Sequence, residues 1–315
     1  MTTDDTVPLG LRERAPRLWA LWAAARPSQV LLVALVYGLG VGIATNGPPL
    51  SGGRWRGVEA TAPSLLAGLA ALVPVTVAIH YANEYADAET DARTTRTPFS
   101  GGSGALERTG LPRRFLGRAT VGALLASALA VGGLLTVGDT TPVTVLTVIL
   151  VVGLAYSLPP IALIRRGVGE LVNAVLGGVL LPLYGVSVVA GVRPAAALVT
   201  LPFALLVGCN LCATHWPDRE ADATVGKRTL AVRLSPRVLR RLYVALAVTA
   251  GLTVAALWLA TLLPTSVALS HLAAGPFLVW GGYTLTRQRS PFPSVAAMVV
   301  TAVTTTVAWW WLGVG

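Results

Sequence analysis

The sequence predicts an all-α, polytopic membrane bundle of about nine transmembrane helices. Of its 315 residues 54% are hydrophobic and only 12% are charged, and the mean hydropathy is +0.68. A soluble domain carries about 25% charged residues, and long uncharged stretches are typical of segments that cross a bilayer. The composition excludes a disordered chain, a secreted disulfide scaffold and an ordinary cytosolic enzyme.

Nine apolar stretches give the expected spans, most of them close to the roughly 20 residues that a crossing helix needs. They cover residues 28–45, 62–80, 115–137, 142–158, 171–191, 195–214, 242–263, 266–285 and 294–313. The fourth stretch ends at Pro159-Pro160, a pair that disfavours further helix. We expect an N-terminal cytoplasmic segment, 1–27, and a single transmembrane domain, 28–315. Its main cytoplasmic loops are expected near 81–114 and 215–241.

The basic residues indicate the orientation. Successive connections between the predicted spans lie alternately on the two sides of the membrane. Of the 24 Lys and Arg residues, only Arg54, Arg56 and Arg193 fall on the side opposite the N-terminus. Positively charged loops stay in the cytoplasm, so we expect a multi-pass protein of the cell membrane with its N-terminus inside and its C-terminus outside. The net charge of +10 then marks a membrane face. We expect no nucleic-acid partner and no obligate protein partner.

Two spaced acidic sets follow apolar stretches at this cytoplasmic side. The first is Asn83-x-x-x-Asp87-x-x-x-Asp91 and the second is Asp218-x-x-x-Asp222. Four-residue spacing places such side chains on one helix face, where like charges repel. A bound cation reverses that repulsion, so the sets predict cation binding. A solvated acidic helix end is the simpler alternative.

The two sets also resemble each other. His80-Tyr-Ala-Asn83-Glu-Tyr-Ala-Asp87 aligns with His215-Trp-Pro-Asp218-Arg-Glu-Ala-Asp222, and Arg93-Thr94 aligns with Arg228-Thr229 at the same offset. An even number of spans separates the sets, so both face the same side. The pattern indicates a possible internal duplication about an axis along the membrane normal, with two acidic faces across a central cavity.

Carboxylates paired in this way suit Mg²⁺, which takes one or two carboxylates and completes its shell with water and phosphate oxygens. Two sets are enough to hold Mg²⁺ ions around one diphosphate, with Lys and Arg on the remaining oxygens. The glycine-rich segment 98–104 follows the first set, and its backbone amides can approach a phosphate; a merely flexible loop has the same composition. A substrate with a phosphate head and an apolar tail fits this setting.

These motifs resemble the UbiA superfamily of intramembrane prenyltransferases. The likeness rests on the two acidic sets in a nine-span chain, on Arg26-Pro27, on Tyr156-Ser157-x-Pro-Pro with Arg165, and on the segment 218–230. It implies an all-helical bundle around a central cavity that opens to lipid. It also implies Mg²⁺-dependent transfer of a polyprenyl group from an isoprenyl diphosphate to an aromatic or other acceptor.

The segment from Asn83 to Asp87 and the run from Gly226 to Leu230 resemble most closely the 1,4-dihydroxy-2-naphthoate polyprenyltransferases of menaquinone biosynthesis. That branch often has an Asn-rich, Arg-containing run before its second acidic pair. This chain has Thr214-His-Trp-Pro217 there instead. 4-Hydroxybenzoate, homogentisate and geranylgeranylglyceryl phosphate therefore remain alternative acceptors.

The resemblance suggests a role for each candidate residue. The expected metal ligands are Asn83, Asp87, Asp91, Asp218 and Asp222, of which Asp87 and Asp218 are also expected to be catalytic. Lys227 and Arg228 are the catalytic candidates for binding the diphosphate. The expected substrate-binding residues are Arg26, Arg93, Tyr156 and Arg165. Arg26 and Arg165 can equally serve as positive anchors at the membrane face, and Tyr156 as an aromatic anchor rather than as a ring that stabilises a cation.

Three further features remain open. His80 and His215 can accept protons, although a packed or capping imidazole is the more common role. Cys209-x-x-Cys212 has redox spacing, but it lies inside an apolar stretch and is expected to be a buried, inert pair. A secondary transporter also has many spans, internal repeats and rare acids. A transporter more often places those acids near the bilayer midplane, whereas here they lie at the edge.

Overall fold

The computed structural model describes residues 9–46, 60–136, 140–192 and 194–311. Within these ranges the secondary structure is helical apart from one isolated antiparallel bridge between Thr97 and Ser100. The predicted all-α class is confirmed. Arg54, Arg56 and Arg193, the basic residues expected on the outer side, lie outside the described residues.

Eight described helical segments are long and apolar enough to cross a membrane. They are α2–α3 (Pro16–Ala25 and Pro27–Asn46), α4 (Ala62–Asp91), α6 (Arg114–Leu134), α7 (Thr140–Ser157), α8–η3–α9 (Gly169–Val175, Leu176–Leu180 and Leu181–Val189), α10 (Pro194–Thr214), α13 (Pro236–Leu259) and α16 (Phe292–Trp311). A ninth, α14–η4–α15 (Thr265–Ser270, His271–Ala274 and Gly275–Thr284), is interrupted by a 3₁₀ turn. The nine segments match the nine predicted stretches, and the chain is a multi-pass membrane protein.

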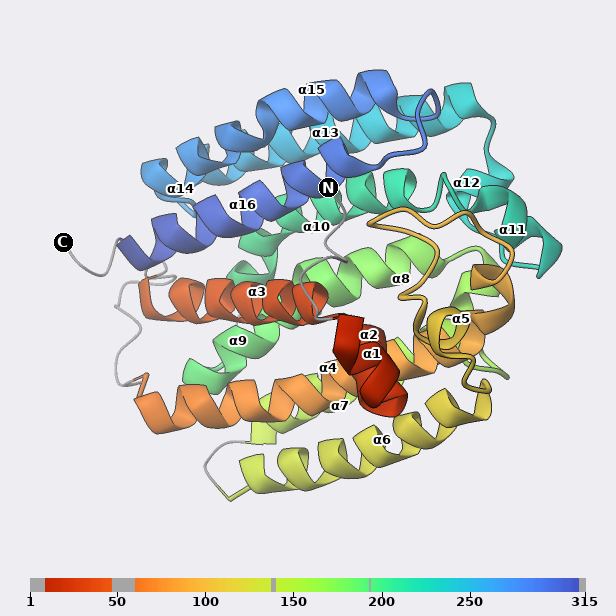
Figure 1. Ribbon diagram of the computed structural model, residues 1–315. Helices are drawn as coiled ribbons and strands as arrows, with labels where there is room; N and C mark the ends of the chain where they lie inside the picture. The colour runs from red at the N-terminus through yellow and green to blue at the C-terminus, as the bar shows by residue number, and fades with distance from the viewer. Residues whose placement is uncertain (1–8, 47–59, 137–139, 193, 312–315) are drawn as a thin grey trace.

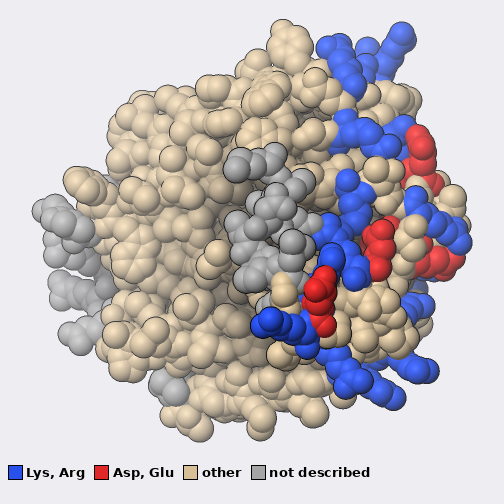
Figure 2. Space-filling model, viewed as in Figure 1, with Lys and Arg blue, Asp and Glu red and all other residues tan. Residues whose placement is uncertain are grey.

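Short helices occupy the connections at one end of the bundle. They are α5 (Ala105–Thr109), η2 (Leu163–Arg166), α11 (Arg219–Thr224) and α12 (Leu230–Arg233), whereas α1 (Leu9–Arg14) precedes α2. Figure 1 shows α5, α11 and α12 together at the right-hand end of the long helices. In the face that Figure 2 shows, the Lys and Arg side chains gather at that same end. On this face, the basic residues gather at one end of the bundle, as the sequence predicts.

Helix α4 is longer than its predicted span. Its apolar part begins at Ala62, after an N-cap in which the Thr61 side chain accepts the Ser64 amide at 3.3 Å, but the helix continues to Asp91. The expected loop from residue 81 therefore begins only at Ala92. This extension carries the first acidic set beyond the predicted span on a continuous helix, so its side chains keep helical spacing.

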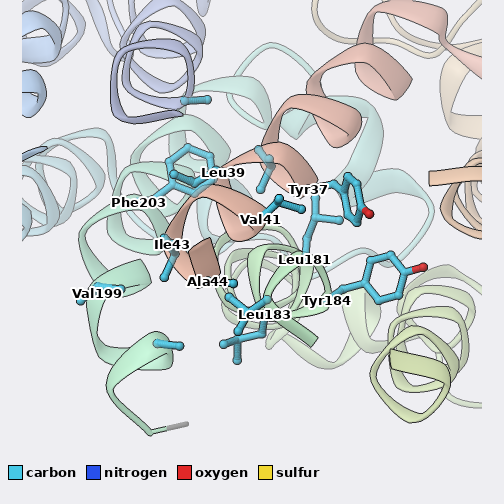
Figure 3. Packing of buried hydrophobic residues seen from close by; sticks show 14 of the residues in the cluster. Tyr37, Leu39, Val41, Ile43, Ala44, Leu181, Leu183, Tyr184, Val199 and Phe203 are labelled. Atoms are coloured by element: carbon cyan, nitrogen blue, oxygen red, sulfur yellow. The ribbon is translucent and has the colours of Figure 1, made fainter. Parts of the chain in front are cut away.

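The core lies between α3, α9 and α10, as Figure 3 shows for residues such as Tyr37, Val41, Tyr184 and Phe203. Two buried tyrosines add polar ties. Tyr37 donates its hydroxyl to the Leu65 carbonyl at 3.0 Å, and Tyr184 donates to the Gly68 carbonyl at 2.7 Å. Both acceptors belong to the first turns of α4. Buried tyrosine hydroxyls usually find such partners, and here they bind α3 and α9 to α4.

Close backbone contact joins α3 to α9. A Cβ on Gly40 would collide with the Pro182 carbonyl, and one on Gly185 would collide with the Tyr37 carbonyl. Small residues permit this approach between helices in lipid, where packing rather than the hydrophobic effect drives association.

The N-terminal part of the chain contains α1 and α2, and α2 continues into α3 across Arg26. Trp19 and Ala20 of α2 are buried against Tyr81 of α4 and Leu116 of α6. Tyr81 donates its hydroxyl to the Leu21 carbonyl at 3.0 Å. This packing holds the α2–α3 junction, where Arg26 lies, beside the acidic part of α4.

Candidate active site

The first acidic set occupies the last turns of α4. Asn83, Asp87 and Asp91 follow one another at one-turn intervals on this helix, as predicted. Ser157, the last residue of α7, donates its hydroxyl to Asn83 Oδ1. The amide of Asn83 is therefore held against the end of the neighbouring span.

The second acidic set follows α10. Asp218 precedes α11, and Asp222 lies within it, with the Asp222 amide donating to the Asp218 carbonyl at 2.8 Å. The two side chains are thus one turn apart, as expected. Asp222 is only 3% exposed. Such burial of a carboxylate requires a compensating cation or hydrogen bonds.

Lys227 joins the two sets. Its Nζ lies 3.0 Å from Asp87 Oδ1 and 3.1 Å from Asp222 Oδ1. Burial lowers the pKa of this ammonium, but the two carboxylates outweigh burial and raise the pKa above its ordinary value. Lys227 is therefore a fixed positive charge between acids that lie far apart in the sequence.

The glycine-rich loop contacts both acidic sets. The Gly101 amide donates to Asp218 Oδ2 at 3.1 Å, and a Cβ on Gly102 would collide with the Asp91 carboxylate. Gly101 and Gly102 have φ values of +79° and +71°, which glycine adopts at little cost. The loop has a defined conformation here rather than being only a flexible connection.

Asp218 has an unusual environment. Burial, and then the charge of Asp222, raise its pKa from 3.8 to about 6. Its Oδ2 accepts from Gly101, whereas its Oδ1 is buried without a hydrogen-bond partner in the described part of the chain. A buried carboxylate oxygen left in this state is a ready ligand for a cation.

Glu84, which the sequence analysis did not select, is the most extensively bonded acid of the region. It is 4% exposed, accepts Arg26 Nε at 2.8 Å, and accepts the Ser103 amide at 2.9 Å and the Ser103 hydroxyl at 2.5 Å. One carboxylate thus binds the α2–α3 junction and the glycine-rich loop to α4. Only its position beside Asn83 in the first motif could have suggested it.

Tyr156, in the last turn of α7, precedes Ser157, which binds Asn83. It is near enough to Asp87, Asp222 and Glu170 to sense their charges. Arg26 likewise senses Asp87 and Asp91 in addition to its ion pair with Glu84. The structure therefore brings together the two acidic sets, Lys227, Arg26 and Tyr156.

Three predicted basic residues are less engaged. Arg93 pairs with Glu89 at 2.5 Å and donates to Thr224 Oγ1 at 3.0 Å, which links α4 to α11. The Arg165 and Arg228 side chains are exposed and make no hydrogen bond or ion pair within the described ranges. Only the Arg228 amide is engaged, donating to the Ile164 carbonyl at 3.1 Å.

The contacts of the two histidines and the burial of the two cysteines fit the structural roles that the sequence favours. His80 Nδ1 lies 2.8 Å from the Ala25 carbonyl and His215 Nδ1 lies 3.0 Å from Glu170 Oε1. Cys209 and Cys212 are buried and are not joined by a disulfide. None of the four directly contacts an acid of the two sets by a hydrogen bond in the described residues.

A pocket of about 260 Å³ lies beside the first set. It is lined by Glu84, Asp91, the glycine-rich loop and α5. Because Glu84 and Asp91 contribute to its wall, a polar or charged group in this pocket would lie directly against the acidic end of α4.

Oxygen ligands for Mg²⁺ are present, although in the described ranges no three His, Cys, Asp or Glu side chains already converge as a metal cage. Mg²⁺ is usually held by one or two carboxylates, with water and substrate phosphate oxygens completing its shell. The paired carboxylates and the unpartnered Asp218 Oδ1 fit this mode of binding.

A comparison with protein families identifies the family of this chain. Residues 40–313 match the model of the UbiA prenyltransferase family. The chain belongs to the UbiA prenyltransferase family. It is therefore a prenyltransferase, and the alternative of a secondary transporter is set aside.

Solved structures share the UbiA fold with this chain. A UbiA homologue from Archaeoglobus fulgidus bound to DMAPP and Mg²⁺ has a TM-score of 0.68 at 14% identity, covering 93% of this chain and 98% of that one. An apo UbiA homologue from Aeropyrum pernix K1 has a TM-score of 0.65 at 14% identity, covering 88% and 95%. A digeranylgeranylglyceryl phosphate synthase has a TM-score of 0.62 at 11% identity, covering 93% and 99%. No curated protein matches the sequence.

Proposed function

We propose that this UbiA-family enzyme transfers a polyprenyl group from an isoprenyl diphosphate to 1,4-dihydroxy-2-naphthoate, a step of menaquinone biosynthesis, with Mg²⁺ as cofactor. The observation that carries the donor half is the convergence of two acidic sets on Lys227. Carboxylates with a fixed ammonium suit a metal-bound diphosphate. The Archaeoglobus fulgidus homologues, described with GPP or DMAPP and Mg²⁺, support this proposal through their fold.

In this proposal the acidic side chains bind the metal ions, and Lys227 binds the diphosphate directly. Asp87, Asp91, Asp218 and Asp222, with the Asn83 amide, supply oxygen ligands. Mg²⁺, when bound, supplies positive charge to the leaving diphosphate. Lys227 adds a donor from inside the site and Arg228 one from its exposed edge. Arg93, which already links α4 to α11, is a further donor.

The apolar helices and Tyr156 act on the prenyl group during cleavage of the allylic carbon–oxygen bond and formation of the new carbon–carbon bond. The bond between the allylic carbon and the diphosphate oxygen breaks, and its electron pair leaves with the diphosphate. Helices around the chain hold the prenyl tail and exclude water that would otherwise capture the allyl cation. The Tyr156 ring can stabilise that cation. The electron-rich acceptor ring then forms the new carbon–carbon bond and loses its carboxylate as carbon dioxide.

An anionic aromatic acceptor suits the basic end of the bundle. Arg26 and Arg165 are its candidate partners, Arg26 after release from Glu84 and Arg165 from its exposed position. This physical argument admits 4-hydroxybenzoate or homogentisate equally. The resemblance of the Asn83–Asp87 and Gly226–Leu230 segments to the naphthoate branch is what favours 1,4-dihydroxy-2-naphthoate.

The orientation is part of the proposal. We place the basic end, with the active site, on the cytoplasmic side of the cell membrane, with the N-terminus inside and the C-terminus outside. The acceptor and the diphosphate head of the donor would then reach the site from the cytoplasm, and the polyprenyl tail from the bilayer.

A competition assay tests the acceptor. The purified protein receives one polyprenyl diphosphate with 1,4-dihydroxy-2-naphthoate, 4-hydroxybenzoate and homogentisate together, with and without Mg²⁺, and products are resolved by mass. A prenylated naphthalene product lighter by carbon dioxide should dominate, and only with Mg²⁺. Prenylated 4-hydroxybenzoate that keeps its carboxylate, or exclusive use of geranylgeranylglyceryl phosphate in a parallel reaction, would overturn the acceptor assignment. Equal turnover without divalent cations would overturn the role of Mg²⁺.

A further inference from the structure

Glu170, a buried acid outside both acidic sets, holds two ends of one loop. It lies in the first turn of α8 and is 4% exposed. Its Oε1 accepts the Leu230 amide at 2.5 Å and faces His215 Nδ1 at 3.0 Å. A carboxylate oxygen only accepts hydrogen bonds, so the His215 Nδ1 atom carries the proton in this contact.

The two partners of Glu170 bracket the second acidic set. His215 directly follows α10, and Leu230 is the first residue of α12. Between them lie Asp218, Asp222 and Lys227. One carboxylate oxygen therefore closes the whole segment that supplies the second half of the active site.

The Leu230 amide requires an external partner. At the first position of α12, it belongs to the opening turn, whose amides have no acceptor within the helix. The Thr229 side chain accepts only the Val232 amide, at 3.3 Å. Without Glu170 the Leu230 amide would be left unsatisfied, which is costly for a partly buried group.

Besides the contacts of Glu170, two further hydrogen bonds join residues 228–233 to the segment that precedes α8. The Arg228 amide donates to the Ile164 carbonyl at 3.1 Å, and Arg233 Nη1 donates to the Gly167 carbonyl at 3.3 Å. The Arg233 contact is exposed, so water competes for it, whereas Glu170 is shielded.

We propose that Glu170 is a positioning residue, which sets the placement of Asp218, Asp222 and Lys227 by tying both ends of segment 215–230 to α8. It makes no hydrogen bond or ion pair to those three side chains in the described structure, so it acts through His215 and the Leu230 amide. Its catalytic consequence rests on the proposed function, but its effect on the loop does not.

Two conservative variants distinguish the effect of the length of the Glu170 side chain from the effect of its charge. Glu170→Asp keeps the charge but shortens the side chain, so the oxygen no longer spans both partners. Glu170→Gln keeps the length and an acceptor oxygen but removes the charge. Tyr184→Phe is the matched control, because it removes a buried hydrogen bond, to the Gly68 carbonyl, away from this segment.

Two measurements in detergent report on the loop without any substrate. Amide hydrogen exchange follows a peptide containing Leu230, and limited trypsin digestion follows cleavage after Lys227 and Arg228. In Glu170→Asp we expect both rates to rise about tenfold or more, the factor that loss of a charge-assisted hydrogen bond allows. In Glu170→Gln and Tyr184→Phe both should stay within about threefold of wild type.

The Mg²⁺ concentration for half-maximal prenyl transfer gives the functional readout. It should rise about tenfold in Glu170→Asp and change little in Glu170→Gln and Tyr184→Phe. Unchanged loop rates in folded Glu170→Asp would overturn the proposal. So would a Glu170→Gln variant with a protected loop but impaired Mg²⁺ dependence, because charge would then matter rather than placement. If wild-type protein transfers no prenyl group, the proposed function fails while the loop measurements still decide the role of Glu170.

Discussion

The Gly101 amide donates a hydrogen bond to Asp218 Oδ2 over 3.1 Å. The loop that follows the first acidic set is therefore fastened to the first residue of the second. Like the Lys227 bridge between Asp87 and Asp222, this bond directly links the two halves of the site. Both links involve a carboxylate predicted to bind metal, so the geometry of each half depends on the other.

The raised pKa of Asp218 predicts a pH dependence of stability. Its folded-state pKa of about 6 exceeds its ordinary value of 3.8, so the folded state binds the proton more tightly between these values. The contribution of Asp218 to the free energy of unfolding therefore falls as pH rises from about 4 to about 6. Asp218→Asn has no such titration, and its Tm should exceed that of wild type most clearly above pH 6.

Thermal unfolding in detergent with EDTA, from pH 5 to pH 8, measures this difference. The Tm advantage of Asp218→Asn should narrow toward pH 5. Glu89→Gln serves as the control, because it removes an exposed carboxylate of α4. A gap in Tm that stays constant across the range would contradict the assigned pKa.

Substitution of Gly102 tests the contact between the glycine-rich loop and Asp91. In Gly102→Ala the added Cβ would collide with the Asp91 carboxylate. The φ of +71° adds a strain of roughly 1–2 kcal/mol. Turnover should fall at least about tenfold, since a small misplacement of a catalytic group is costly.

Gly110→Ala is the matched control for Gly102→Ala. Gly110 also has a positive φ, of +65°, but a Cβ there meets nothing within 4 Å. It should share the loss of thermal stability and keep wild-type turnover. Equal loss of turnover in the two variants would mean that strain alone, and not the contact with Asp91, explains the result.

Asp87→Asn tests the acidic sets themselves. It removes one of two charges that hold Lys227 and one expected metal ligand, so turnover should fall by roughly 100-fold or more. The fold should survive, because Asp222 still pairs with Lys227 after the change. Steady-state kinetics at saturating Mg²⁺ and circular dichroism provide the measurements. Glu89→Gln on the same helix should change neither, and wild-type turnover in Asp87→Asn would remove Asp87 from the mechanism.

Lys227→Met should destabilise the metal-free protein. Removal of the ammonium leaves Asp87 and the buried Asp222 facing each other without a cation, and breaking a buried ion pair from one side costs roughly 3–5 kcal/mol. Addition of Mg²⁺ should recover part of the lost Tm, because the metal replaces the missing charge. Arg93→Met removes an exposed ion pair with Glu89 and should cost at most about 1 kcal/mol. Insensitivity of the Lys227→Met variant to Mg²⁺ would argue against metal binding at these carboxylates.

Reporter fusions test the orientation. A reporter fused after residue 315, which lies outside the described residues, should be extracytoplasmic, since nine segments separate it from an inner N-terminus. A reporter inserted within 219–241 should be cytoplasmic. Alkaline phosphatase and fluorescent-protein activities in the same cells distinguish the two. Finding both reporters on the same side would refute the nine-span topology.

The sequence predicted the spans and the acidic sets because both follow from local rules. Apolar length marks a membrane helix, and four-residue spacing places Asn83, Asp87 and Asp91 on one face. The proposed duplication and the fine assignment of metal ligands stay predictions. The sequence does not predict the break in the eighth span, because hydropathy does not distinguish a single 3₁₀ turn at residues 271–274 from α-helix.

The remaining site residues could not be predicted from the sequence, because their roles depend on tertiary contacts. Glu84 and Glu170 are single acids with no spacing pattern, and their partners come from distant segments, such as Arg26 for Glu84 and Leu230 for Glu170. The partners of Lys227 were equally hidden, since nothing local pairs it with Asp87. Arg228, its neighbour, has the same local signal but an exposed side chain without a partner in the described ranges. Only the fold distinguishes the two.

The glycine contact between α3 and α9 bears on how a lipid-soluble substrate enters. Backbones that meet at Gly40 and Gly185 have no side chains between them that can rotate aside. Parting these two helices would sacrifice their packing outright. We therefore expect a prenyl chain to enter the bundle away from the α3–α9 contact. That route can be mapped by crosslinking from a photoreactive tail.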